Sequence, residues 1–196
     1  MLKSKKIKLV AFVGFGLFLF FVVVPPITRA WYRNHPVKYP SEIPMSKWKS
    51  FSSAEGKFSV WFPGVPDVTN VILTVSNVDF SEPCYFVWAD AQTEYAVNYG
   101  DYPKGLEKLK PEQQFDICQS GVAGKVGKIV YQKDLKFGDY PARDFEFVAG
   151  GKANYSGRIR LILTGERLYQ IVVIFLTGNP HPTDGDIFLN SFRCLN

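Results

Sequence analysis

An apolar run near the N-terminus separates this chain into a targeting segment and a folded domain. Leu9–Val24 contains no charged side chain, and lysines at positions 3, 5, 6 and 8 precede it. Pro25-Pro26 stops any helix there, because proline has no N–H to donate and its ring clashes with the preceding turn. At about 1.5 Å per residue, the run through Ile27 is just long enough to cross a hydrocarbon core of about 30 Å. The sequence therefore predicts a membrane-directed helix at the N-terminus.

Two fates are open for this segment, residues 1–30. As a signal anchor it keeps its lysines inside and places Trp31 at the membrane–water boundary, where aromatic rings are favoured. As a signal peptide it is cleaved after Ala30. The length of the run favours the anchor. We therefore expect a single-pass protein of the cell membrane with its N-terminus inside and its domain extracytoplasmic, or a secreted or periplasmic protein if cleavage occurs.

The charge of the chain is concentrated in the same segment. The net charge is +5, and residues 1–30 hold five of the 23 Lys and Arg residues but none of the 18 acidic residues. The rest of the chain is formally neutral. Because nucleic-acid binding relies on a basic surface that neutralises phosphates, we expect no nucleic-acid partner.

The remainder divides into a spacer and one domain. Asn34–Pro44 contains three prolines, which favour an extended chain, so residues 31–52 are predicted to be an extended linker. Residues 53–196 have a length typical of one domain.

Hydrophobic periodicity in residues 53–196 predicts an α+β fold. Period-two alternation or apolar runs typical of strands occur in these segments: Phe58–Phe62, Val71–Val75, Tyr85–Ala89, Tyr95–Tyr99, Ile129–Phe137, Phe145–Phe147, Tyr155–Leu163 and Leu168–Leu176. Pro111 begins a predicted helix that ends near Gly121 and Gly124, and Thr183 and Asp186 precede a short helix at Ile187–Phe192. Hairpin connections dominate, so we expect a largely antiparallel sheet of about six to eight strands flanked by helices. Leu168–Leu176 is almost entirely apolar, which predicts a central strand covered on both faces.

Five phrases in this order resemble the PsbP-like superfamily, including its uncharacterised exported or membrane-anchored bacterial members. They are Glu55–Gly64 (EGKFSVWFPG), Tyr95–Pro103 (YAVNYGDYP), Gly138–Phe147 (GDYPARDFEF), Arg167–Phe175 (RLYQIVVIF) and Phe188–Arg193 (FLNSFR). The resemblance covers nearly all of residues 53–196. It implies an antiparallel sheet between helical layers, acting as a non-enzymatic accessory or assembly module beside membrane complexes. It brings no shared catalytic motif.

Residue types that carry chemistry are sparse. His181 is the only histidine of the domain, so no nucleophile, base and orienting group can be assembled around it. Asp184 and Asp186 could approach a hard cation, but acids at a helix N-terminus are also favoured by its dipole. Asp139 and Asp144 are the other acids that a hydrolase could use. We expect no enzyme activity, no cofactor and no metal.

Three arginines and two cysteines remain as candidates. Arg158 and Arg160 share one side of a predicted strand, and with Arg143 they could contact an anion or a partner, since guanidinium groups bind carboxylates and phosphates in a forked geometry. Alternatively they pair with the strand acids Asp144 and Glu146. Among the three possible pairings of the cysteines, Cys118 with Cys194 is the preferred disulfide, and three buried thiols are the alternative.

These features predict a membrane-tethered, extracytoplasmic, non-catalytic binding or accessory module. The membrane is its partner through the N-terminal helix, and a membrane protein complex is the candidate for a second partner. The alternatives are a carboxylate- or metal-dependent hydrolase and a small-ligand carrier, which would need an apolar pocket of about 300 Å³ or more. The sequence specifies neither a particular partner nor an oligomeric state.

Overall fold

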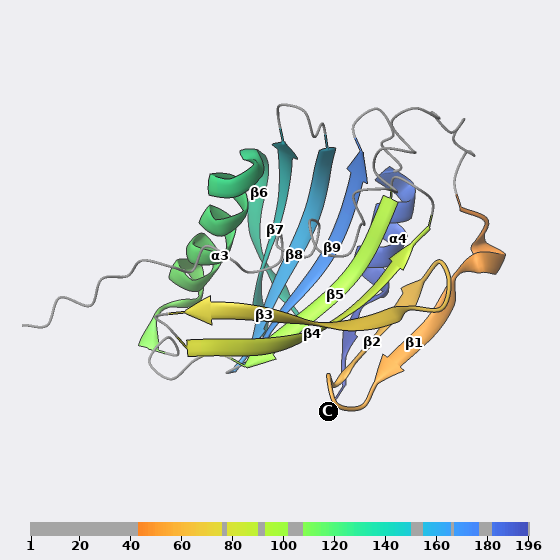
Figure 1. The fold of residues 1–196 in the computed structure, drawn as a ribbon, viewed down its shortest axis with the longest axis horizontal. Coiled ribbons are helices and arrows are strands. Elements are labelled where there is room, and N and C mark those ends of the chain that lie inside the picture. The colour runs from red at the N-terminus through yellow and green to blue at the C-terminus, as the bar shows by residue number, and fades with distance from the viewer. Residues whose placement is uncertain are drawn as a thin grey trace, which may run out of the picture.

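The computed structural model describes residues 43–75, 78–89, 93–101, 108–149, 155–165, 167–176 and 182–195. The apolar run and residues 31–42 of the predicted linker lie outside this part. Within it, no helix is long and apolar enough to cross a bilayer. The described elements form a large twisted sheet with a helix on each face and a small sheet beside it (Figure 1).

The large sheet has seven antiparallel strands. Their spatial order is β3 (Asp67–Val75), β4 (Val78–Trp88), β5 (Thr93–Asp101), β9 (Arg167–Leu176), β8 (Tyr155–Thr164), β7 (Tyr140–Ala149) and β6 (Gly127–Phe137). Neighbours in the chain are neighbours in the sheet except where β9 pairs with β5, which joins two meanders. The segments Tyr85–Ala89 and Tyr95–Tyr99, both predicted as strands, lie in β4 and β5, which pair with each other as an antiparallel hairpin.

The small sheet contains β1 (Lys49–Ser53), β2 (Phe58–Phe62) and β10 (Arg193–Cys194), preceded by the one-turn helix η1 (Met45–Lys47). β2 matches its predicted range. Four of the five residues of β1 lie in the range predicted as linker, so the folded part of the chain begins before residue 53. Its sequence, KSFSS, gives little sign of this, because Phe51 is the one large apolar side chain in the strand. Pairing with β2 along all five residues makes it a strand.

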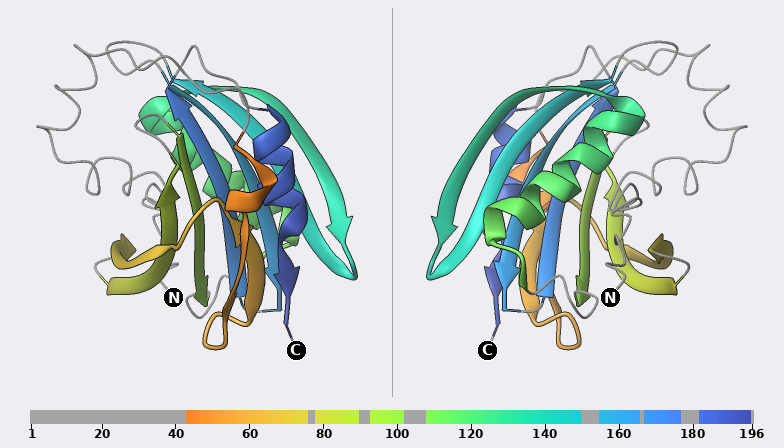
Figure 2. Two further views of the ribbon diagram at one scale, coloured as in Figure 1. Left: turned by 90° about the vertical axis from the view of Figure 1, so that its right-hand side faces the viewer. Right: turned by 90° about the vertical axis from the view of Figure 1, so that its left-hand side faces the viewer.

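Two α-helices cover opposite faces of the large sheet. α3 (Pro111–Val126) lies on one face, whereas α4 (Pro182–Ser191) and the small sheet lie on the other (Figure 2). The predicted start of α3 at Pro111 is confirmed, but the helix continues through Gly121 and Gly124. α4 begins five residues before the predicted Ile187, because proline at the first helical position is already set to a helical φ and needs no N–H there.

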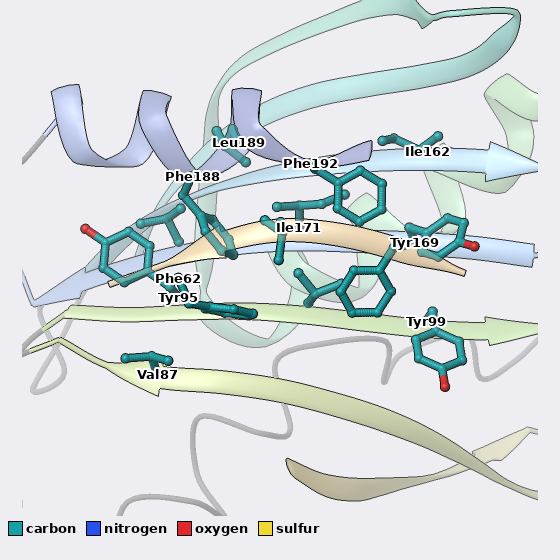
Figure 3. Close-up of a cluster of buried hydrophobic side chains, with 14 of the residues drawn as sticks. Phe62, Val87, Tyr95, Tyr99, Ile162, Tyr169, Ile171, Phe188, Leu189 and Phe192 are labelled. Atoms are coloured by element: carbon teal, nitrogen blue, oxygen red, sulfur yellow. The ribbon is translucent and has the colours of Figure 1, made fainter. Parts of the chain in front are cut away.

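Each face of the sheet has its own apolar core. Phe115 and Cys118 of α3 pack with Phe145 and Phe147 of β7 in one. Aromatic side chains of the small sheet and α4 dominate the other, where Phe58 and Phe192 stack at 5.7 Å between ring centroids. Figure 3 shows part of this second cluster, with Phe188, Phe192 and Tyr169 gathered between α4 and the sheet.

The central strand β9 joins the two cores. Its side chains alternate between them, Leu168, Val172 and Ile174 facing α3 and Tyr169, Ile171 and Val173 facing α4. This confirms the prediction of a strand buried on both faces. The α+β class and the antiparallel sheet are also confirmed, and the seven strands of the large sheet lie within the predicted six to eight. The separate three-stranded sheet was not predicted, because β1 and β10 were not recognised as strands and β2 was assigned to the main sheet.

The predicted disulfide is wrong. All three cysteines lie in the described part of the chain, and none is joined to another. Cys118 packs in the α3-side core, whereas Cys194 lies at the edge of the α4-side core, with the large sheet between them. A helix on one face of the sheet and a strand on the other cannot bring two Cβ atoms within the roughly 4 Å that a disulfide needs.

Candidate functional site

The structure divides the three candidate arginines between the two faces of the large sheet. Alternation along β7 and β8 places Arg158 and Arg160 on the face that α4 covers, and Arg143 on the face that α3 covers. The three guanidinium groups therefore do not form one anion site. Each is held by acids of this chain, which is the alternative that the sequence left open.

Arg160 and Arg158 connect the sheet to α4. The Arg160 guanidinium donates to both carboxylate oxygens of Asp144 at 2.7 and 2.8 Å, and to the backbone carbonyl of Leu189 at 3.0 Å. Arg158 pairs with Glu146 at 3.2 Å and with Asp186 at 2.7 Å. These bonds cross from β8 to β7 and from the sheet to the helix, so they hold α4 in place.

Arg143 connects the other face of the sheet to α3. Its guanidinium is buried and donates to Asp134 on β6 and to Asp116 and Gln119 on α3, at 2.5, 2.5 and 3.0 Å. It also lies over the Phe115 ring, 5.5 Å from the centroid. The hydrogen bond from Arg143 holds the pKa of Asp134 below its ordinary value, and the same bond raises the pKa of Arg143.

The acids that a hydrolase would use do not converge. Asp139 is exposed in the β6–β7 turn and Asp144 is bound by Arg160. Asp186 is bound by Arg158, and Asp184 is buried and accepts the Ile43 N–H at 3.0 Å. Within the described ranges, no group of three or more His, Cys, Asp or Glu side chains is arranged to hold a metal ion.

The sheet face beside α3 holds a set of buried polar residues that the sequence analysis missed. We call it the α3-face polar cluster: Glu82, Glu94, Asn98, Gln114 and Gln170. Asn98 on β5 is paired across the strands with Gln170 on β9 and, on its other side, with Cys84 on β4. The strand members thus span three adjacent strands in the middle of the large sheet, and Gln114 is a buried polar side chain of α3, the helix on the same face.

Burial changes the ionisation of the two carboxyl groups in this cluster. Burial raises the pKa of Glu82 to about 8, and the charge of Asp101 adds to the shift. Burial alone raises the pKa of Glu94 to about 8. Room for Glu82 comes from Gly100, since a Cβ on that residue would lie 2.1 Å from Oε1 of Glu82. At neutral pH both groups are therefore largely protonated and can donate a hydrogen bond as well as accept one.

Several polar atoms of the cluster make no hydrogen bond within the part of the chain that the structure describes. They are Oε2 of Glu94, Oδ1 of Asn98, Oε1 of Gln114 and Nε2 of Gln170. Leaving such a buried atom unpaired costs about 1–3 kcal/mol, so groups of this kind normally bind water or a ligand. Chemically, the cluster offers neutral donors and acceptors to a small polar molecule.

The sequence does carry a signal for this cluster. Gln170 is the one strongly polar residue inside the apolar strand β9, and Asn98 and Glu94 interrupt the apolar residues of β5. A polar side chain on a strand that is covered on both faces must be buried, and a buried polar group needs a partner.

Comparison with known proteins identifies the fold. No family model and no curated protein sequence matches the chain. Among solved structures, a protein from Bacteroides thetaiotaomicron VPI-5482 aligns at 11% identity with a TM-score of 0.47 over 76% of this chain and 49% of its own. The cyanobacterial PsbP protein CyanoP of Synechocystis sp. PCC 6803 aligns at 10% identity with a TM-score of 0.55, over 81% of this chain and 99% of CyanoP. The antiparallel sheets of seven and three strands with their two covering helices therefore form a PsbP-like fold.

Proposed function

We propose that this chain is a non-catalytic binding module that its N-terminal segment holds at the outer face of a membrane, where it docks onto a membrane protein complex. Two facts support the proposal. The fold is PsbP-like, and resemblance to that superfamily implies an accessory role. The apolar run and its preceding lysines supply the attachment.

One observation favours binding over carboxylate chemistry: arginines bind two of the four candidate acids, Asp144 and Asp186. A general base or nucleophile needs an oxygen that faces the substrate and a pKa suited to its task. Both carboxylate oxygens of Asp144 instead accept hydrogen bonds from one guanidinium group, and Asp186 forms an ion pair with Arg158. Such pairing leaves these carboxylate oxygens occupied by groups of the chain itself. In this geometry the acids serve to join elements together.

Attachment to a membrane would make even a weak docking surface effective. Confining two partners to one surface raises their effective concentration, so a contact that is weak in solution can be occupied without additional contacts. This mechanism needs no catalytic group, and it needs the domain to be on the same side of the membrane as its partner.

The experiment uses the full chain with a C-terminal tag, expressed in its own host. Intact cells are first treated with protease, and we expect the domain to be digested from outside the cytoplasmic membrane. Crosslinking in living cells followed by solubilisation should then capture a specific membrane protein. The matched control replaces Leu9–Val24 with a cleavable signal sequence, which exports the domain without attaching it and should lose most of the crosslink. A protected domain, or the same crosslinks with both chains, would contradict the proposal.

A second function, small-ligand binding, is favoured by the α3-face polar cluster. The sequence predicted that a small-ligand carrier would have an apolar pocket. This cluster is polar, so the ligand would be a small molecule with hydrogen-bonding groups. Native mass spectrometry of the gently purified full chain should show an added mass that is lost on mild unfolding. Gln170→Leu should remove this mass, whereas Gln132→Leu, on the exposed strand β6, should keep it. An unmodified mass in the wild-type protein would count against this function.

A further inference from the structure

We infer that one end of the β1–β2 hairpin is a membrane-contact surface. This surface, the hairpin end, consists of the apolar side chains of Met45, Trp61 and Val65 together with Lys47 and Lys49. It contacts the bilayer with its apolar side chains at the level of the headgroups and its lysines on anionic lipid. The inference rests on the membrane attachment in the proposed function and adds the orientation of the domain.

Strand register brings the segments that carry these residues to one end of the hairpin. Lys49 pairs with Phe62 and Ser50 with Trp61, so η1 before β1 and the residues after β2 leave the hairpin at the same end. Figure 1 shows η1 at the outer edge of the domain, beside the beginning of β1. The exposed fractions are 56% for Met45, 43% for Trp61 and 89% for Val65. Single exposed apolar residues are ordinary, but three large ones carried by segments that meet at one end of a hairpin suggest a contact surface.

The backbone beneath these side chains is held firmly. Trp48, between the two lysines, is buried and meets the Tyr95 ring edge-on at 5.5 Å. The Ile43 N–H donates to Asp184 of α4 at 3.0 Å, and the Trp61 N–H donates to Ser191 Oγ at 2.9 Å. The apolar side chains are therefore presented outward by a rigid support and are not left over from a loose terminus.

The residue types suit a lipid surface. Tryptophan is favoured at the membrane–water boundary, because its ring is apolar and its N–H can stay hydrated. Lys47 and Lys49 are both exposed, and lysines near a bilayer are attracted to anionic headgroups. The exposed acids in the described segment from Ile43 to Val68 are Glu55, in the β1–β2 turn at the other end of the hairpin, and Asp67, so the lysines outnumber the acids at this end.

The chain preceding Ile43 identifies the bilayer as the occupant. The membrane-directed run ends at Val24, and only residues 25–42 separate it from the described domain. A segment of that length reaches at most about 60 Å even when fully extended. It joins the domain directly beside Met45, so the hairpin end is the part of the described domain closest to the attachment point along the chain.

The test measures contact between Trp61 and lipid in the full chain. The protein is reconstituted into vesicles that contain brominated lipid, with and without an anionic lipid, and is recovered by flotation. Tryptophan quenching is compared between the wild type and Trp61→Phe, so that their difference reports Trp61 alone among the four tryptophans of the chain. We expect Trp61 to be quenched, and the double variant Lys47→Glu, Lys49→Glu to lose that quenching in anionic vesicles.

Val65→Asp provides a test without cost to the core, because the side chain is almost fully exposed. It should abolish Trp61 quenching while circular dichroism stays unchanged. The matched control is Tyr140→Asp, at the exposed first residue of β7 and at the opposite end of the sheet, which should retain the quenching.

Two results would overturn the inference, and they differ in what else they affect. A chain that floats with the vesicles while Trp61 escapes quenching would show that the hairpin end faces away from lipid and is left for a protein partner; membrane attachment would stand. A chain that does not float at all would remove the membrane attachment in the proposed function as well.

Discussion

Two buried carboxyl groups, Glu82 and Glu94, are the least ordinary single residues of the described domain. Both remain largely protonated at neutral pH, because burial disfavours the charged form. An unfolded chain exposes them to water, where their ordinary pKa of 4.5 applies. The difference between the two states makes the stability of this protein depend on pH.

We predict that the free energy of unfolding falls as the pH rises from about 5 to 8. In this window the unfolded chain has released both protons while the native protein retains them, so each group lowers stability by up to about 1.4 kcal/mol per pH unit. Denaturant titrations at several pH values measure the slope. Glu94→Gln should remove one group's share of it, and Glu55→Gln, the same change at an exposed site, is the matched control. A flat profile for the wild type would show that neither carboxyl group is held protonated.

Gly100 provides a second test of the same region. We predict that Gly100→Ala destabilises the protein by roughly 1–3 kcal/mol, the usual range for overpacking, because the new Cβ would lie 2.1 Å from the buried Glu82 carboxyl. Gly64→Ala is the control, since its Cβ meets Val87 at an ordinary 3.5 Å. In a Glu82→Ala background the penalty of Gly100→Ala should largely disappear. A penalty that persists there would have to arise from the backbone and not from the carboxyl group.

Among the elements, α3 depends on Arg143 for its position. We predict that Arg143→Lys costs roughly 2–3 kcal/mol, because an ammonium cannot reproduce the fork that joins Asp134 to Asp116, and hydrogen bonds to charged groups are worth about 1.5–3 kcal/mol. Hydrogen exchange should show faster opening of α3 before the sheet. Arg158→Lys is the matched control and should cost less, since the Arg158 side chain is 25% exposed and that of Arg143 is 3% exposed. Equal losses would mean that burial of the guanidinium does not matter.

The elements differ in how far sequence alone could predict them. β2 and β9 follow from local pattern: one alternates, and the other is apolar throughout because it is covered on both faces. β1 and β10 exist because they pair with β2. The five residues of β1 carry little apolar pattern of their own, and the partner of the two-residue strand β10 is distant in the chain. The helix start at Pro111 was predictable from local chemistry, but the end of α3 was not, since glycine weakens a helix without always terminating it.

The candidate site was likewise predictable from local sequence only in part. Arg143 lies on the same side of β7 as Phe145 and Phe147. Strand alternation alone therefore places it on the opposite face of the sheet from Arg158 and Arg160. The polar cluster was also marked in part, by Gln170 inside an apolar strand. Its other members come from β4, β5 and α3, and only the sheet order brings those segments to one place.

For the molecule as a whole, the segment before β1 closes the α4-side core. Trp48 is buried against Tyr95, and Phe51 meets both Phe62 and Tyr85 at ring-centroid distances of 5.9 and 5.0 Å. These contacts connect the start of the described chain to strands β2, β4 and β5. The cooperative unit of folding should therefore include this segment, although the prolines of the neighbouring spacer led the sequence to predict a linker there.

We predict accordingly that a chain of residues 43–196 unfolds cooperatively, whereas residues 53–196 do not form a stable domain. Losing one buried large aromatic side chain costs about 3–5 kcal/mol, and the shorter chain loses Trp48, Phe51 and the whole ladder between β1 and β2. That loss is comparable with the entire stability of a typical domain, about 5–15 kcal/mol. Thermal and denaturant unfolding of the two chains would measure the difference, with Trp48→Ala in the longer chain as an intermediate case. If both chains unfolded at the same midpoint, β1 would be an attachment to the domain and not a part of its core.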